Sequence, residues 1–343
     1  MKAMVISRVC DVTTAGGPLK AVELPDPSPA SDEILVRVLA CGVCHTELDE
    51  IEGRTPPSRF PRVPGHQVVG VVEERGSAAG RFEVGDRVGV AWIFRACGAC
   101  EACKRGLENL CEHFQATGRD ADGGYAQYMT VPEGFAFPIS DALPSASTAP
   151  LLCAGAIGCR SLELTGIANG QSLGLTGFGA SAHLVLQMVR HRFPDTRVYV
   201  FARSPGEREF ALSLGACWAG DTDASAPEKL DAVIDTTPAW RPVLSALEQL
   251  KSAGRLVINA IRKEDVDKQF LQRLDYPSHL WMEKEIKSVA NVQRSDVEQM
   301  LQIAAEMSLK PTVQTYSLKE ANRALRELKG KKIRGAKVLV FDK

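Results

Sequence analysis

The sequence predicts an α/β protein in which a β-rich region is followed by a parallel sheet built from βαβ units. Two contrasting sequence patterns along the chain indicate this division. Up to about residue 150, short Val-rich runs alternate with turns rich in Gly and Pro, as is typical of strands joined by tight connections. Beyond about residue 154, strand-like runs alternate with segments of helical apolar spacing. With 343 residues, the chain is long enough for about two domains.

The β-rich region contains four candidate strands. Each is rich in β-branched residues and is bounded by turn formers such as Pro25-Asp26-Pro27. These strands are expected over residues 2–8, 33–40, 68–75 and 86–92.

The second region is expected to alternate strand and helix. Strands are expected over 173–176, 198–202, 232–237 and 255–261, and helices over 182–191, 206–214 and 240–252. Gly215 follows the second of these helices, where glycine commonly ends a helix. Alternation at this spacing predicts parallel strands joined by crossover helices.

Two capping-box patterns near the end of the chain predict two further helices. Ser295-x-x-Glu298 and Ser317-x-x-Glu320 each place a hydroxyl three residues before a carboxylate. The basic stretch 329–337 is expected to be a solvated loop, and residues 336–341 are expected to form a last strand.

Composition and charge narrow the classes of function. The formal net charge of -1 gives no reason to expect nucleic acid or an anionic membrane as a partner. The sequence has no apolar run of about 18 residues and no signal-peptide pattern at its N-terminus, so we expect no membrane span and a cytoplasmic location. In a reducing compartment, a cysteine cluster more often binds metal than forms disulfides.

Four of the ten cysteines form the pattern C-x2-C-x2-C-x7-C. They are Cys97, Cys100, Cys103 and Cys111. Four thiolates in one short loop can surround a tetrahedral Zn²⁺ with no open position, so we expect a structural zinc site, with free cysteines as the alternative. An iron–sulfur run would have an earlier fourth cysteine followed by proline, and Glu112 stands there instead.

A second set of candidate ligands is open. Cys44 follows an expected strand, and His66 precedes another. Cys153 lies where the β-rich pattern gives way to alternating strands and helices. Each residue alone is more often structural than functional. Together, two thiolates and an imidazole offer a three-ligand zinc site with room for a substrate.

The chain resembles the zinc-containing medium-chain alcohol dehydrogenases along nearly its whole length. The resemblance is carried by Cys44-His45-Thr46, Gly65-His66-x-x-x-Gly70, Gly85-Asp86-Arg87-Val88, the four-cysteine loop and Cys153-Ala154-Gly155. It implies a GroES-like catalytic domain formed by residues 1–153 and 292–343, with a Rossmann dinucleotide-binding domain of doubly wound parallel sheet inserted at 154–291.

The same resemblance implies two zinc ions per chain. Cys44, His66 and Cys153 match the catalytic zinc ligands, the four-cysteine loop matches the structural site, and Trp92 matches a position in the substrate pocket. Thr46 matches the residue that accepts the proton of the alcohol and passes it on.

Three residues depart from the family pattern. Gln67 replaces a Glu that can approach the metal in some members, and Glu47 replaces an Asp that orients the zinc-bound His from outside. Asp49 stands where some members have a His that passes protons to solvent. Gln67 makes the site less negative, and with Asp49 the chain lacks the His of the outer proton path.

A dinucleotide-binding pattern opens the second region. Gly177-Phe178-Gly179-Ala180-Ser181-Ala182 fits G-x-G-x-x-G/A between an expected strand and an expected helix. We therefore expect Gly177, Gly179 and Ala182 to lie at the pyrophosphate. The next strand ends in Ala202-Arg203-Ser204, without the carboxylate that holds the ribose of NAD.

This loop favours NADP(H) over NAD(H). Arg203, Ser204 and Arg208 can bind a 2′-phosphate that a carboxylate would repel. The alternative is that Arg203 stacks on the adenine and NAD is accepted.

The resulting hypothesis is an alcohol dehydrogenase or aldehyde reductase that transfers hydride between a small-molecule alcohol and NAD(P). The resemblance implies a homodimer or homotetramer. A polyol or sugar dehydrogenase of the same fold is a second hypothesis, although such enzymes usually lack the complete four-cysteine loop or use a carboxylate ligand. A zinc-stapled binding protein without activity is a third hypothesis, favoured by Gln67 and Asp49 and opposed by the retained ligands.

Overall fold

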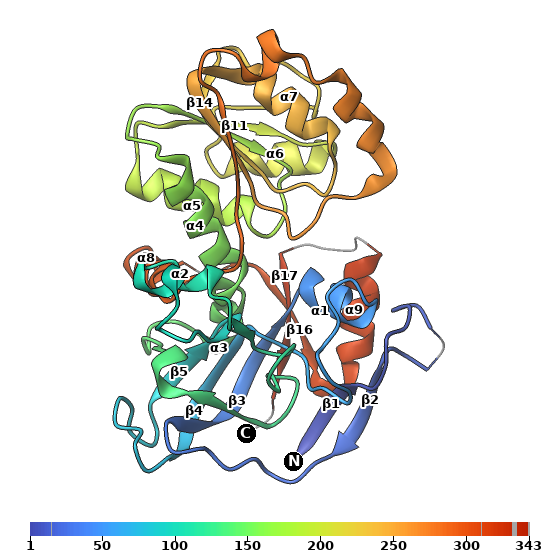
Figure 1. The fold of residues 1–343 in the computed structure, drawn as a ribbon, viewed down its shortest axis with the longest axis vertical. Coiled ribbons are helices and arrows are strands. Elements are labelled where there is room, and N and C mark those ends of the chain that lie inside the picture. Colours follow the sequence, from blue (N-terminus) through green and yellow to red (C-terminus); the bar gives the residue numbers. More distant parts are fainter. Residues whose placement is uncertain (15, 310, 331–334, 342–343) are drawn as a thin grey trace. The chain divides into compact units, whose positions relative to one another are not determined.

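The fold was analysed in a computed structural model, which describes residues 1–14, 16–309, 311–330 and 335–341. The chain divides into two compact units, one formed by Met1–Ala156 with Asn291–Lys343 and the other by Ile157–Ala290 (Figure 1). No helix within the described residues has both the length and the apolarity needed to cross a membrane.

A seven-stranded sheet forms the framework of the first unit. Its central strand, β3 (Glu33–Val43), pairs antiparallel with β4 (Val68–Arg75), β8 (Tyr128–Pro132) and β17 (Ala336–Val340). The sheet order is β16-β17-β3-β4-β5-β9, with β8 also on β3. The β-branched residues of β3 and β4 other than half-buried Val71 are buried in this unit. The other strands of the unit are β1 (Lys2–Ile6), β2 (Leu19–Glu23), β5 (Arg87–Val90), β6 (Ile93–Arg95), β7 (Gln115–Ala116), β9 (Ala136–Pro138) and β16 (Val313–Ser317).

Short helices cover the ends of this sheet. Helix α1 (His45–Ile51) follows β3 directly and lies beside α9 (Ala321–Lys329), as Figure 1 shows. The others are α2 (Glu101–Lys104), α3 (Ser145–Thr148) and α8 (Arg294–Glu306), and α4 (Ala154–Thr165) begins at the end of the unit.

The second unit is a parallel six-stranded sheet with the order β12-β11-β10-β13-β14-β15. The chain runs outward from β10 to β12 and then returns to β13, so the order reverses between β10 and β13. In such sheets ligands bind at the carboxyl ends of the strands on either side of the reversal. The strands are β10 (Ser172–Thr176), β11 (Arg197–Phe201), β12 (Trp218–Gly220), β13 (Leu230–Asp235), β14 (Leu250–Ile258) and β15 (Glu285–Ser288); the helices are α5 (Ala182–Arg192), α6 (Pro205–Ser213) and α7 (Arg241–Gln249). The predicted α/β class and parallel sheet are confirmed.

Three expectations from the sequence were wrong in detail. The helix expected over 240–252 ends at Gln249, because Leu250 is already extended and begins β14. The capping box expected at Ser295 lies two residues earlier, where the Gln293 N–H donates to Asp296 Oδ2 (2.7 Å).

The third correction concerns the basic stretch 329–337. Residues 331–334 lie outside the described residues, but Lys337 belongs to β17 and is buried rather than solvated. Its ammonium donates to the Tyr316 hydroxyl (2.6 Å) and to Glu327 (2.9 Å), which makes burial of the charge possible.

Candidate functional site

Three expected metal ligands meet in the first unit. Their ligand atoms, from Cys44, His66 and Cys153, lie within 4.8 Å of one another. The Cys44 Sγ is 3.6 Å from the His66 Nε2. Tetrahedral zinc with Zn–S of about 2.3 Å and Zn–N of about 2.05 Å would separate these atoms by about 3.6 Å. The three side chains therefore fit a zinc ion with one position open.

The turn from β3 into α1 positions Cys44. Cys44 is the N-cap of α1, and its sulfur accepts a hydrogen bond from the Thr46 N–H (3.3 Å). The Cys44 N–H in turn donates to Glu47 Oε2 (2.8 Å), which completes a capping box. The helix start therefore fixes the sulfur and places half-buried Thr46 beside it.

His66 is fixed by a glycine before it and a carboxylate behind it. Gly65 has a φ of +102°, and a Cβ there would lie 2.4 Å from the Tyr125 ring, so no larger residue fits. The His66 Nδ1 lies 2.7 Å from Glu47 Oε1, and both side chains are fully buried. This contact leaves Nε2 facing Cys44 for a metal.

Cys153 lies near the end of the segment Met1–Ala156 of this unit. It follows the 3₁₀ turn Ala149–Leu152 and immediately precedes α4. In the absence of a cation, its hydrogen bond to Cys44 and the burial of the site raise the pKa of the Cys44 thiol well above the usual range. A divalent cation reverses this preference, because it binds the thiolate.

Glu50 is a buried carboxyl that the sequence did not single out. It lies one turn after Glu47 on α1 and has no exposed surface. Neither of its oxygens has a hydrogen-bond partner among the described residues. Burial and the negative charge of Glu47 raise the pKa of Glu50 well above its ordinary value. Nothing in its local spacing marks it, because some of the groups that act on it, such as Arg119 and Asp120, are distant in sequence.

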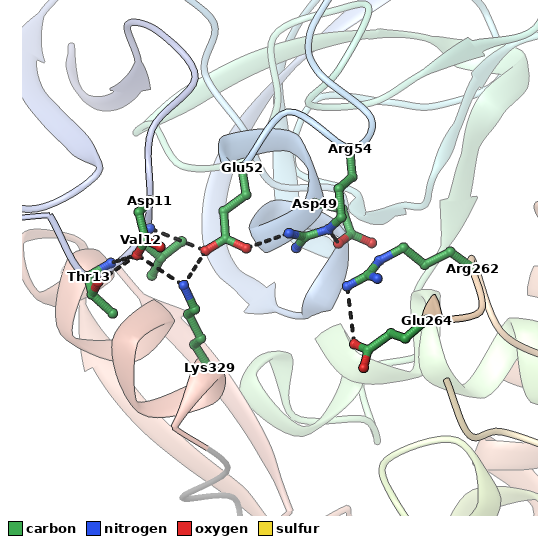
Figure 2. A network of polar contacts seen from close by, with 9 residues as sticks. All are labelled: Asp11, Val12, Thr13, Asp49, Glu52, Arg54, Arg262, Glu264 and Lys329. Carbon is green, nitrogen blue, oxygen red and sulfur yellow. Dashed lines mark hydrogen bonds and ion pairs between the residues drawn. The ribbon is translucent and has the colours of Figure 1, made fainter. Parts of the chain in front are cut away.

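Asp49, the residue in the expected proton-relay position, is tied to an arginine. Its carboxylate is buried and pairs with Arg54, whose Nη1 also donates to Glu52 (2.6 Å). Figure 2 shows this pair continuing through Glu52 to Lys329 and Asp11, whose carboxylate bonds Lys329 (3.0 Å). Asp49 is therefore part of a fixed charge network and not a solvent-facing base.

The two remaining residues of this region have different surroundings. Gln67 is buried, and its Nε2 has no partner among the described residues. The Trp92 ring lies with its centroid 5.0 Å from the His66 ring in an edge-to-face contact. The Trp92 Nε1 donates to Asn291 Oδ1 (3.0 Å), so the indole is held against the ligand.

The four-cysteine loop gathers its sulfur atoms at a second point. The ligand atoms of Cys97, Cys100, Cys103 and Cys111 all lie within 4.8 Å of one another. The sulfurs of Cys97 and Cys111 are 3.5 Å apart, close to the roughly 3.8 Å of a tetrahedral zinc site with Zn–S of about 2.3 Å.

Backbone N–H groups favour the thiolate form of Cys97 and Cys100, whereas burial and the neighbouring cysteines raise the pKa of the Cys103 thiol in the metal-free site. Cys97 Sγ accepts from the N–H groups of Ala99 (3.4 Å) and Cys100 (3.3 Å). Backbone hydrogen bonds from Cys103 and Glu112 lower the pKa of the Cys100 thiol to about 6. Thiolates stabilised in this way are the ligands that zinc requires.

The dinucleotide pattern lies in the expected context in the second unit. Gly177 directly follows β10 with a φ of +76°, and a Cβ there would lie 2.9 Å from Thr236 Oγ1. A Cβ on Gly179 would meet no atom within 4 Å, so the space above this glycine is open. Ala182 begins α5, whose N-terminus favours a phosphate.

The loop after β11 carries the expected phosphate-binding residues. Arg203 is exposed, and Ser204 caps α6 by accepting from the Glu207 N–H (3.5 Å). Arg208 is partly engaged, because its Nη1 donates to the carbonyls of Ala202 (2.8 Å) and Arg203 (3.1 Å). Arg208 therefore shapes the loop, while the Arg203 side chain is presented to solvent.

A buried ion pair stands next to the glycine turn. Asp235 at the end of β13 is fully buried, accepts from Thr176 Oγ1 (2.6 Å) and pairs with Lys263. Lys263 also donates to the carbonyls of Thr237 (2.8 Å) and Ala239 (3.0 Å). This cluster rigidifies the strand ends at the reversal of sheet order, and no motif in the sequence pointed to it.

Sequence comparisons identify the family of the chain. A family model for the alcohol dehydrogenase GroES-like domain matches residues 30–141, and one for zinc-binding dehydrogenases matches residues 217–340. A probable alcohol dehydrogenase, AdhA, of Mycobacterium tuberculosis is 43% identical over 330 residues, which are 95% of this chain and 93% of that protein. An alcohol dehydrogenase of Geobacillus stearothermophilus is 32% identical over 95% of this chain and 97% of its own length.

Solved structures give the same fold. A cinnamyl alcohol dehydrogenase of Sorghum bicolor superposes with a TM-score of 0.86 over 99% of this chain and 97% of that chain, at 26% identity. A thermostable alcohol dehydrogenase of Pyrobaculum aerophilum superposes with a TM-score of 0.87 over 99% of each chain, at 24% identity. The second likeness concerns the fold alone.

Proposed function

The chain belongs to the zinc-containing medium-chain alcohol dehydrogenase family and acts on alcohols and aldehydes, and from this premise we propose that it is a zinc- and NADP(H)-dependent enzyme. The observation that carries the zinc dependence is the convergence of Cys44, His66 and Cys153. We assign these three residues to a catalytic zinc and the four-cysteine loop to a structural zinc, which makes two ions per chain.

A few residues carry the proposed roles in the catalytic site. Zinc would supply a Lewis acid that polarises the oxygen of the substrate. Cys44 and His66 hold the ligand geometry, and Glu47 orients the imidazole from behind. Thr46, whose N–H is bonded to the Cys44 sulfur, is placed to accept the proton of an alcohol. Trp92 forms the wall of the substrate pocket beside His66.

The cofactor would lie at the carboxyl ends of β10 and β11. Gly177 and Gly179 leave room for the pyrophosphate, and Ala182 begins the helix whose N-terminus faces it. The nicotinamide would supply the site that accepts or donates hydride. The exposed Arg203 guanidinium and the Ser204 hydroxyl would bind a 2′-phosphate, with Arg208 holding the loop.

We also propose a homo-oligomer built on a dimer. Strand β15 is the last strand of its sheet, and all of its residues are exposed. Exposed apolar side chains accompany it, namely Tyr276, Trp281, Met282 and Ile286. Large exposed apolar groups beside an open strand edge are typical of an interface. A reducing compartment such as the cytoplasm would keep the six proposed cysteine ligands available to zinc.

The decisive test is the initial rate of aldehyde reduction with NADPH and NADH side by side, on a small aldehyde panel with zinc-replete protein. We expect a clear preference for NADPH, because the strand end Ala202-Arg203-Ser204 carries an arginine and no carboxylate. A preference for NADH would overturn the phosphate-binding role of Arg203 and keep the dehydrogenase. No rate with either cofactor would contradict the proposed function.

Cys44→Ser is the matched variant for the zinc assignment. We expect it to abolish turnover and to leave NADPH binding, followed by cofactor fluorescence, largely unchanged, because Cys44 lies in the other unit from the glycine turn. Near-normal turnover in this variant would show that the role assigned to Cys44 is wrong.

A further inference from the structure

We propose that Arg119 selects the substrate by donating hydrogen bonds to an oxygen acceptor on the part of the molecule remote from the reacting carbonyl. The substrate class would then be an aldehyde or alcohol that carries a second oxygen function, above all a carboxylate. This inference rests on the proposed function and deepens it.

Arg119 lies directly over the wall of the proposed pocket. Its guanidinium carbon is 5.5 Å from the centroid of the Trp92 ring, and that ring is 5.0 Å from the His66 ring. The same indole therefore contacts both a cation and a proposed zinc ligand. A substrate that packs along Trp92 would bring its far end to the guanidinium.

The backbone around Arg119 is fixed to the segment that carries His66. The Thr117 N–H donates to the Trp92 carbonyl (2.9 Å). Gly118 has a φ of +84°, and a Cβ there would lie 2.7 Å from the Gly65 nitrogen, so the two segments touch through their glycines. The position of Arg119 is thus set by the same contacts that set His66.

The guanidinium has donors left to offer. Asp120 receives Nε (3.1 Å) and Nη2 (2.7 Å), and the Ala116 N–H holds the same Asp120 oxygen (2.8 Å). Within the part of the chain that the structure describes, no protein group accepts from Nη1. The Arg119 side chain is 29% exposed, and we assign Nη1 as the donor that meets the ligand. An arginine fork suits a planar carboxylate, and such charge-assisted bonds are about twice as strong as neutral ones.

A purely structural role does not account for this arrangement. The Trp92 indole is already held by its bond to Asn291 and by the His66 ring, so a clamp over its face is not needed to position it. An aliphatic side chain would cover the ring with no desolvation cost for a charge. The positive charge also reaches the interior, since it is one of the influences that lower the pKa of buried Glu50, against the larger opposing effects of burial and Glu47.

The test compares two aldehydes of similar shape, 4-carboxybenzaldehyde and 4-isopropylbenzaldehyde, by the ratio of their kcat/KM values with NADPH. We expect the carboxylate to be preferred by the natural enzyme. Arg119→Met should lower this ratio about tenfold, because one charge-assisted hydrogen bond is lost, and Arg119→Lys should restore part of it. Arg95→Met, which removes a half-buried arginine of β6 paired with Asp32, should leave the ratio unchanged.

Each outcome decides between the two proposals. Equal kcat/KM for the two aldehydes in the natural enzyme, or an unchanged ratio in Arg119→Met with zinc content and thermal midpoint preserved, would overturn the role of Arg119 while the dehydrogenase stands. Loss of the preference in Arg95→Met as well would also overturn it, because the effect would not be specific to the pocket. Failure of every aldehyde in the panel would contradict the proposed function itself.

Discussion

Glu47 shows how a single side chain can link the start of a helix to a metal ligand. One carboxylate oxygen accepts the Cys44 N–H (2.8 Å), and the other lies 2.7 Å from the His66 Nδ1. The same group therefore fixes the sulfur ligand through the capping box and the imidazole ligand through its outer nitrogen. The family commonly uses a shorter carboxylate here, and in this chain the longer side chain makes both contacts.

This double role leads to a prediction for Glu47→Gln. A Gln oxygen can still accept the Cys44 N–H, but the neutral amide loses the charge that raises the basicity of His66. We expect the affinity of the catalytic zinc to fall by roughly 10–100-fold. Competition with a chelator measures it, and the zinc of the four-cysteine loop should stay bound as an internal reference.

Glu47→Asp is the control, because it keeps the carboxylate. It should retain most of the affinity. If Glu47→Gln holds both zinc ions as tightly as the natural protein, the carboxylate does not support His66 in the way proposed.

At the residue scale, the sequence predicted the groups that short motifs carry. The four cysteines lie in one loop, and Cys44 and His66 each lie beside a strand boundary, so local pattern and residue chemistry were enough to propose them. Glu50 and Arg119 could not be found in this way. Their surroundings are made by segments distant in sequence, which no spacing within the chain reveals.

At the scale of elements, β16, β17 and α9 meet at a small polar cluster within an apolar corner. Lys337 on β17 is buried and donates to Tyr316 on β16 (2.6 Å) and to Glu327 on α9 (2.9 Å). Tyr316 also donates to Glu327 (2.6 Å), and Arg323 forms an ion pair with Glu327 (2.9 Å). Three elements that carry the end of the chain back to β3 are thereby tied at one carboxylate.

The cluster predicts a pH dependence of stability. Hydrogen bonds from Tyr316, Lys337 and Arg323 lower the pKa of Glu327 from 4.5 to about 2. Because the folded-state pKa is depressed, the stabilisation is complete above pH about 4.5 and is lost as the pH falls toward about 2. Glu327→Gln should therefore lower the thermal midpoint at pH 7, and the difference from the natural protein should shrink between pH 5 and 3.

The matched control is Glu23→Gln, which changes an exposed carboxyl of β2 in the same unit. Its midpoint should follow that of the natural protein at every pH. A Glu327→Gln deficit that stays constant down to pH 3 would show that the carboxylate charge is not what stabilises the corner.

Elements were predictable wherever one local signal dominated. The strand expected over 68–75 and the capping box at Ser317 are confirmed, because β-branched pattern and cap chemistry agree there. The end of α7 and the start of α8 were misplaced by a few residues. There the local sequence suits helix on both sides of the boundary, and pairing of Leu250 in the sheet and capping by Gln293 decide it.

At the scale of the whole molecule, the two units differ in how far apart in sequence their parts lie. The first unit joins the two ends of the chain, with β17 lying against β3. The second unit is formed by one continuous segment in a single parallel sheet. This arrangement lets the proposed zinc ligands and the proposed dinucleotide residues belong to separate compact units, each with its own core.

The second unit also has an open strand edge with exposed apolar residues beside it, which a monomer does not explain. Strand β15 hydrogen-bonds to β14 on one side, and no other strand among the described residues pairs with its second edge. The exposed Tyr276 and Trp281 rings lie 5.7 Å apart just before the strand, and Ile286 within it is 47% exposed. An open edge with this apolar surround promotes pairing between chains, and a second copy would present the same edge.

Ile286→Lys is therefore expected to weaken the assembly. A lysine would have to be desolvated at the centre of the paired edge, opposite its own copy, so the dimer should dissociate at a protein concentration at least about tenfold higher than for the natural protein. Sedimentation velocity over a range of concentrations measures this shift. Leu212→Lys is the matched control, because Leu212 is equally exposed (49%) on α6 and away from β15 in sequence and pairing. A natural protein that is monomeric at all concentrations would refute the proposed dimer, whereas an Ile286→Lys protein that stays dimeric would place the interface elsewhere on the chain.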